Sequence, residues 1–247
     1  MFPIKIGMKV VGNNLLPMVF DLTRNCHVLI CGRSGTGKSY ALKLIFRSLL
    51  DYQDRIDIFC LDFKNSGDYS FMDPPHLSYG KQCVEMLNDI YERFVEIKEK
   101  NLPTRILVCF DEYAAFLHFL NGVDKKLGKK AMDQVSEILM MGRRLNQNGG
   151  AVYMWTVLQR PDAEYFGNSR ENYMVKIVMC DITRSIRTML EIDEAVIPKE
   201  HVAKPGHGIV VVDDQVYAFV VPVYDEAKMT AMLKAKRSGA KSIAAET

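Results

Sequence analysis

The stretch that most constrains the fold is residues 27–43, HVLICGRSGTGKSYALK, where an apolar run precedes a glycine-rich turn and a helical pattern. The turn fits the spacing G-x-x-x-x-G-K-[ST]. Glycines let backbone N–H groups approach phosphate oxygens, and the N-terminus of the following helix adds partial positive charge. Lys38 is expected to reach the β- and γ-phosphates, and the Ser39 hydroxyl to reach Mg²⁺. We therefore predict a phosphate-binding loop made of Gly32, Arg33, Ser34, Gly35, Thr36, Gly37, Lys38, Ser39 and Tyr40.

Nearly continuous apolar runs alternate with helical patterns along the chain, which is typical of parallel strands covered on both faces. The expected strands are residues 27–32, 55–63, 105–112, 151–159 and 174–180, followed by a hairpin in 208–222. The expected helices lie within residues 38–52, 80–101, 129–150 and 185–193. This alternation predicts an α/β fold. We expect a RecA-like P-loop NTPase with a mostly parallel central sheet, helices on both faces and antiparallel strands near the C-terminus.

The 247 residues are enough for one large α/β domain. We expect a motor domain over residues 1–224, of which 1–22 are a lead-in segment. Residues 225–247 are expected to form a short helix that continues into a basic, flexible tail. No internal repeat or low-complexity linker divides the chain.

Composition indicates an ordinary globular protein, with 48% hydrophobic and 25% charged residues. No apolar run has the length of a transmembrane segment, and the N-terminus lacks the pattern of a signal peptide. The six cysteines form no C-x-x-C pair, which favours a reducing, cytoplasmic location. The net charge of +2 neither demands nor excludes a nucleic-acid partner, although residues 125–130 and 234–241 are strongly basic.

Polar side chains follow three of the expected strands. Asp111 and Glu112 end the apolar run RILVCFDE, where Asp111 is expected to hold Mg²⁺ and Glu112 to orient or deprotonate the attacking water. The alternative is that these carboxylates only cap the next helix. Gln159 ends another strand and is expected to contact the γ-phosphate or the water, and Asp62 ends a third. The carboxyl ends of parallel strands are where such sheets bind ligands, so we predict ATP hydrolysis there.

Two classes of P-loop protein are disfavoured by missing motifs. The chain has no Asn-Lys-x-Asp sequence for reading guanine, which argues against a GTPase switch. It also has no LSGGQ-like stretch, which argues against a transporter ATPase.

The ordered set of motifs resembles the FtsK/SpoIIIE family of DNA translocases. The resemblance begins with FPIKIGMKVVGNNLLPMVFDLTRNCHVLICGRSGTGKS. It continues through FCLDFK, DEYAAFL, MMGRRLNQNGGAVYMWTVLQRPD and SRENYMVKIVMCDITRSIRTML. It extends from about residue 3 to 212. The phosphate loop alone is generic, whereas the set with Gln-Arg-Pro is specific.

The resemblance implies an ATP-driven, hexameric motor that threads double-stranded DNA through a central pore. It also implies an arginine finger from the neighbouring subunit, for which Arg143, Arg144 and Arg170 are candidates. The basic segment 125–130 follows the acid pair, as pore-facing loops of such motors do. We therefore expect DNA contacts from Lys125, Lys126, Lys129 and Lys130.

The sequence also departs from the family pattern, because membrane and winged-helix domains of the large cell-division translocases are not found and Val157-Leu158 stand where Ala-Thr is usual. The leading hypothesis is a DNA translocase acting in conjugative transfer, plasmid mobilisation or DNA segregation. A viral genome-packaging ATPase and a non-motor ATP-binding assembly scaffold are the alternatives. The expected partners are DNA and a relaxase, secretion-channel or capsid protein, in the cytoplasm of the cell or of a host.

Overall fold

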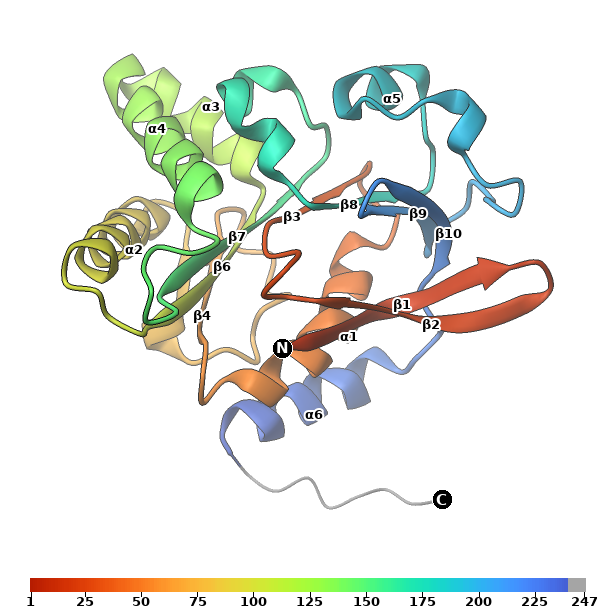
Figure 1. Cartoon of the computed structure of the whole chain (residues 1–247), viewed down its shortest axis with the longest axis horizontal. Coiled ribbons are helices and arrows are strands. Elements are labelled where there is room, and N and C mark those ends of the chain that lie inside the picture. The colour runs from red at the N-terminus through yellow and green to blue at the C-terminus, as the bar shows by residue number, and fades with distance from the viewer. Residues whose placement is uncertain (240–247) are drawn as a thin grey trace.

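The computed structural model describes residues 1–239, which form one ten-stranded sheet in the order β2-β1-β10-β9-β8-β3-β7-β6-β4-β5 (Figure 1). Neighbouring strands from β8 to β5 in this order are parallel. These six strands are β3 (Val28–Cys31), β4 (Asp57–Asp62), β5 (Leu77–Tyr79), β6 (Arg105–Asp111), β7 (Ala151–Leu158) and β8 (Val175–Met179). The predicted P-loop NTPase fold with a mostly parallel sheet is confirmed, and only β5 among these six strands was not expected.

Antiparallel strands complete the other end of the sheet, and the N-terminal segment contributes two of them. The four strands are β1 (Pro3–Val11), β2 (Asn14–Asp21), β9 (His207–Val212) and β10 (Gln215–Val220). The predicted β9–β10 hairpin is confirmed, and its turn residues Asp213 and Asp214 both have positive φ, as a two-residue hairpin turn requires. The sequence reasoning did not predict β1 and β2 as strands. In β1, Ile4 and Ile6 alternate with exposed residues, so this strand buries one face.

Helices cover both faces of the sheet, as predicted. On one face, α1 (Lys38–Leu49) and α6 (Glu226–Arg237) pack with Val28 and Ile30 of β3 in a common core. On the other face, α2 (Gln82–Glu99), α3 (Tyr113–Val123), α4 (Lys125–Met141) and α5 (Arg184–Leu190) pack with Leu29 and Cys31. The short 3₁₀ turns are η1 (Leu50–Tyr52), η2 (Pro74–His76), η3 (Ala163–Tyr165), η4 (Gly167–Asn172) and η5 (Glu194–Val196). In the described part of the chain, no helix has the length and apolarity to cross a bilayer.

The structure corrects the expected connection after the acid pair. Residues 113–123 form helix α3, which the sequence reasoning did not predict. The basic segment 125–130 lies in the first turns of α4 and not in a loop. Helix α4 begins there because the Asp124 carboxylate accepts a hydrogen bond from the backbone N–H of Lys126 at 2.8 Å.

The last helix is confirmed where a short helix was expected, and it begins after Asp225, whose carboxylate caps it. Met229 and Leu233 bury their side chains in the core shared with α1, and α6 lies alongside α1 (Figure 1). The proposed division of the chain at residue 225 stays a prediction. Most of the expected basic tail, residues 240–247, lies outside the described residues.

A histidine just before β3 is buried in the sheet without a charge partner. The His27 ring is fully buried, and its Nδ1 accepts the backbone N–H of Met154 on β7 at 3.0 Å. Its Nε2 has no partner among the described residues. Burial lowers the pKa of His27 from its ordinary 6.5 to about 3. The folded state therefore holds this imidazole neutral at pH values where the unfolded chain protonates it.

We predict that His27 makes the fold sensitive to mild acid. Because its pKa is lowered on folding, its contribution is lost as the pH falls from about 6.5 towards 3. The free energy of unfolding should fall by about 2–3 kcal/mol more in wild type than in His27→Asn between pH 7.5 and 4.5. Asparagine keeps an acceptor for Met154 but does not titrate. Urea denaturation of both proteins at the two pH values measures this difference, and parallel losses would show that His27 is not responsible.

Candidate functional site

The phosphate loop joins β3 to α1 through a backbone path that needs glycine at two positions. Gly37 has φ 95°, and a Cβ there would lie 3.3 Å from the backbone N of Gly206. A Cβ on Gly32 would lie 2.8 Å from the Met179 carbonyl oxygen and 2.9 Å from Oγ1 of Thr36. Side chains at these positions would therefore open the loop or displace β8 and the segment before β9. The sequence pattern and the geometry agree on these two residues.

Lys38, the first residue of α1, curls back over the loop. Its Nζ donates to the carbonyl oxygens of Gly32 at 2.6 Å and Arg33 at 3.1 Å. Burial lowers the pKa of Lys38, and the nearby Glu112 and Asp111 carboxylates oppose that shift. The ammonium therefore lies between the loop backbone and the acid pair, where it can reach phosphate oxygens bound by the loop.

Asp111 is the last residue of β6, and both of its carboxylate oxygens accept hydrogen bonds. Oδ1 accepts the backbone N–H of Glu112 at 2.9 Å, and Oδ2 accepts the Tyr69 hydroxyl at 3.1 Å. Burial, together with the nearby Glu112 and Asp62 carboxylates, raises the pKa of Asp111 to about 7. Tyr69 comes from the segment after β4, and its contact with Asp111 left no signal in the sequence.

Glu112 lies at the sharp turn from β6 into α3. It has φ 54°, a left-handed conformation that is uncommon for a residue with a Cβ and is often found at functional sites. Its side chain makes no capping hydrogen bond with α3, which argues against the alternative that Glu112 only caps this helix. Instead, Glu112 Oε1 lies 3.7 Å from Nζ of Lys64.

A second buried carboxylate lies beside Asp111. Asp62, the last residue of β4, is the register partner of Asp111 on the neighbouring strand and is fully buried. Its Oδ2 accepts the backbone N–H of Ser66 at 2.8 Å and the Ser66 hydroxyl at 2.9 Å. Its Oδ1 is buried and has no partner among the described residues. Two adjacent buried carboxylates, one of which has an oxygen without a hydrogen-bond donor among the described residues, make this strand edge favourable for a cation.

The donor set fits Mg²⁺ bound together with a nucleotide. Within residues 1–239, no group of three or more His, Cys, Asp or Glu side chains is placed to hold a metal ion. Mg²⁺ commonly binds through one or two carboxylates plus substrate phosphates and waters. Asp111 and the Ser39 hydroxyl are the residues that would hold it, and Asp62 lies on the strand next to Asp111.

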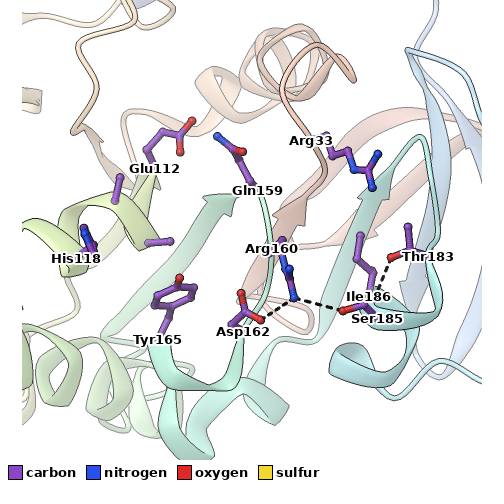
Figure 2. Close-up of a pocket in the computed structure, with 12 residues that line it drawn as sticks. Arg33, Glu112, His118, Gln159, Arg160, Asp162, Tyr165, Thr183, Ser185 and Ile186 are labelled. Carbon is purple, nitrogen blue, oxygen red and sulfur yellow. Dashed lines mark hydrogen bonds and ion pairs between the residues drawn. The ribbon is translucent and has the colours of Figure 1, made fainter.

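Glu112 and Gln159 line a common cavity of about 720 Å³. Gln159 follows β7, and Arg33 of the phosphate loop lines the same space (Figure 2). Arg160 lines it as well, and its guanidinium lies 3.3 Å from both Asp162 and the Ser185 hydroxyl of α5. The sequence reasoning noted the Gln-Arg-Pro motif but did not assign a role to Arg160. The cavity thus extends between the phosphate loop, represented by Arg33, and the two polar residues Glu112 and Gln159.

The three candidate arginines differ in what they contact. Arg143 and Arg144 are exposed and follow α4, close to the start of β7, because Gly142 accepts the Val152 N–H at 2.9 Å. This is the sheet edge opposite the phosphate loop. Arg170 instead donates to the Pro161 carbonyl at 3.4 Å and lies 3.8 Å from Glu191. Its guanidinium is therefore engaged within its own chain.

The predicted DNA-contacting lysines lie together at the start of α4 and outside the cavity of Figure 2. Their side chains are exposed on the N-terminal turns of the helix: Lys125, Lys126, Lys129 and Lys130. Lys129 lines a second cavity of about 390 Å³ with His118 and Tyr165, residues that the first cavity shares. Lys129 is thus near the cavity that Glu112 and Gln159 line.

Comparison with known proteins confirms the predicted resemblance to the FtsK/SpoIIIE family, whose sequence model matches residues 1–100. A search of curated proteins found no match. Among solved structures, the pCW3 conjugation coupling protein TcpA is similar with TM-score 0.71 and 20% identity over 95% of this chain and 70% of that one. EssC ATPases 2 and 3 from Geobacillus thermodenitrificans match with a TM-score of 0.69 and 14% sequence identity, over 99% of this chain and 50% of that chain. VirB4 of Thermoanaerobacter pseudethanolicus matches with a TM-score of 0.57 and 9% sequence identity, over 90% of this chain and 98% of that chain. At these identities the likenesses show a shared fold, and this chain spans about half of the EssC chain.

We predict that the Tyr69 hydroxyl stabilises the buried Asp111 carboxylate. At pH 8.5, above the pKa of about 7 of Asp111, Tyr69→Phe should lower the free energy of unfolding by about 1–3 kcal/mol, because a buried charged acceptor loses its donor. Tyr113→Phe is the matched control, since the Tyr113 hydroxyl is also buried and has no partner among the described residues. Its loss should cost nothing or stabilise the protein. Urea denaturation measures both, and equal effects of the two substitutions would contradict the assignment.

Proposed function

We propose that this chain is the motor domain of a ring-forming ATPase that hydrolyses ATP to move double-stranded DNA. The observation that carries the proposal is the convergence of Lys38, Asp111, Glu112 and Gln159 at the carboxyl edge of β3, β6 and β7. A phosphate-binding loop alone would serve many proteins, whereas a second acid and an amide beside it suit hydrolysis. The confirmed FtsK/SpoIIIE resemblance over residues 1–100 supports the class of motor.

In the proposed mechanism, the loop backbone and Lys38 hold the phosphate chain and neutralise the charge that develops on the γ-phosphoryl group. Glu112 accepts the proton of a water whose oxygen bonds to the γ-phosphorus as the bond to the β-phosphate oxygen breaks. Gln159 orients that water or the γ-phosphate. Ser39 and Asp111 would hold Mg²⁺, which would supply neutralisation of phosphate charge.

Assembly would complete the site. Arg143 and Arg144 are the stronger candidates for an arginine finger because they are exposed at the edge opposite their own phosphate loop. In a head-to-tail ring, a residue on that edge can face the site of the next subunit. Arg170 is the weaker candidate because it already contacts Pro161 and Glu191. A hexameric ring of this kind would make hydrolysis depend on assembly.

The lysines at the start of α4 are proposed to contact DNA phosphates. Helix N-termini and clustered lysines both attract phosphate groups, and such contacts need no base sequence. Conjugative transfer is the favoured setting because the conjugation coupling protein TcpA shares the fold over 95% of this chain. We also propose a cytoplasmic location, which the six free cysteines support.

The test is ATP turnover of the assembled protein with and without duplex DNA. Wild type should hydrolyse ATP faster with DNA, and Lys38→Ala should abolish turnover. Replacing the four α4 lysines by glutamine should remove DNA stimulation but keep basal turnover. The control replaces Lys98 and Lys100, exposed at the end of α2, and should behave as wild type. Nucleotide binding without DNA-stimulated turnover in an assembled sample would refute the motor.

A further inference from the structure

Lys64 places a second ammonium group beside the acid pair, in addition to that of Lys38. It follows β4, which is the parallel neighbour of β6 in the sheet. Its Nζ lies 3.7 Å from Oε1 of Glu112, which is too long for a hydrogen bond, so the contact is an ion pair. Within residues 1–239, neither of these two side chains makes any other ion pair or hydrogen bond. Lys64 and Glu112 are therefore each other's charge partner.

The turn that carries Lys64 is held by the buried Asp62 carboxylate. Its Oδ2 accepts the backbone N–H of Ser66 at 2.8 Å and the Ser66 hydroxyl at 2.9 Å. The Asn65 N–H donates to the Asp62 carbonyl at 3.1 Å, and Asn65 has φ 54°, a left-handed conformation that asparagine tolerates in turns. The backbone of Lys64 is thus fixed inside a closed turn, although its side chain is 62% exposed.

The Glu112 side chain, by contrast, has no neutral hydrogen-bond donor to fix it among the described residues. Only its backbone N–H is engaged, by Oδ1 of Asp111 at 2.9 Å. The side chain is 17% exposed and lines the cavity that Gln159 also lines (Figure 2). A carboxylate that takes a proton from an attacking water must keep its orientation, because small misplacements of a reacting group cost large factors in rate. The contact with Lys64 is the one that supplies this orientation.

Lys38 attracts the same carboxylate from another element. Burial lowers the pKa of Lys38, the Glu112 carboxylate opposes that shift, and the charge of Lys64 adds to it. The two ammonium groups are therefore close enough to repel each other, and both act on Glu112. Lys38 is held by the loop carbonyls of Gly32 and Arg33 at 2.6 and 3.1 Å. Without Lys64, the Glu112 carboxylate would be attracted towards Lys38 with no opposing cation.

We propose that Lys64 is a positioning residue for ATP hydrolysis, which holds the Glu112 carboxylate in place against the attraction of Lys38. This inference rests on the proposed function, in which Glu112 is the base, and adds the group that orients this base. Lys64 acts through Glu112 and not on the nucleotide. Its loss should therefore slow the chemical step and leave the affinity for ATP unchanged.

The test measures single-turnover hydrolysis and binding of MgATP by the assembled full chain. Lys64→Met should lower the hydrolysis rate about tenfold, with ATP affinity within about twofold of wild type. Lys64→Arg keeps the positive charge and should hydrolyse ATP within about threefold of wild type. Lys81→Met is the matched control, because Lys81 is exposed after the neighbouring strand β5 and faces the ring of Phe119 at 5.8 Å. It should behave as wild type.

A double-mutant cycle separates positioning of Glu112 from a purely structural effect of the lysine. In Glu112→Gln the side chain carries no charge, so Lys64 has no carboxylate to hold. Adding Lys64→Met to Glu112→Gln should therefore change the remaining hydrolysis rate by less than about twofold. A similar tenfold loss in both backgrounds would show that Lys64 acts independently of Glu112 and would contradict the assignment.

The remaining failures can be told apart. If Lys64→Met hydrolyses ATP at the wild-type rate while Glu112→Gln does not, the positioning role is wrong and the proposed function stands. If the ATP affinity and the rate of Lys64→Met fall together, Lys64 contacts the nucleotide and is not a positioning residue. Faster hydrolysis by Lys64→Met would show that the lysine restrains Glu112, which also overturns the inference. Hydrolysis by Glu112→Gln at the wild-type rate would refute both the inference and the role of Glu112 in the proposed function.

Discussion

The parallel pairing of β3, β7 and β6 is the constraint on which the rest of the site depends. Their register aligns Cys31 with Leu158 and Asp111 with Val157, so the three strands end at one edge of the sheet. The residues that follow them are the phosphate loop, Gln159 and Glu112. A slip of register in either pair would move these groups away from one another. The buried apolar side chains on both faces of the three strands oppose such a slip.

The same edge buries acidic groups that the fold only partly compensates. Asp62 and Asp111 are register partners, and one Asp62 oxygen has no donor among the described residues. Burial and the adjacent carboxylates raise the pKa of Asp111 to about 7. Burying carboxylates costs free energy unless cations or donors compensate. This arrangement is understandable if the edge evolved to bind a cation with a nucleotide, as such strained electrostatics are often found at functional sites.

Much of the fold and part of the site followed from the sequence because the signals were local. The parallel strands were near-continuous apolar runs, and the phosphate loop had fixed spacing next to a strand and a helix. Tyr69 could not be predicted, because its contact with Asp111 spans 42 residues and leaves no pattern. Helix α3 was missed because its apolar residues continue directly from β6, and the turn at Glu112 is set by a left-handed backbone. The rings of Tyr40 and Tyr224 stack although the two residues are 184 positions apart, so no pattern in the sequence predicts this contact.

The central claim is that this strand edge hydrolyses the nucleotide that the loop binds, with Glu112 as the base. Its most direct test is single-turnover hydrolysis of bound ATP by assembled wild type and Glu112→Gln. The glutamine keeps the size of the side chain, so ATP affinity should stay within about threefold while the hydrolysis rate falls at least about 100-fold. Hydrolysis by Glu112→Gln at the wild-type rate would contradict the account.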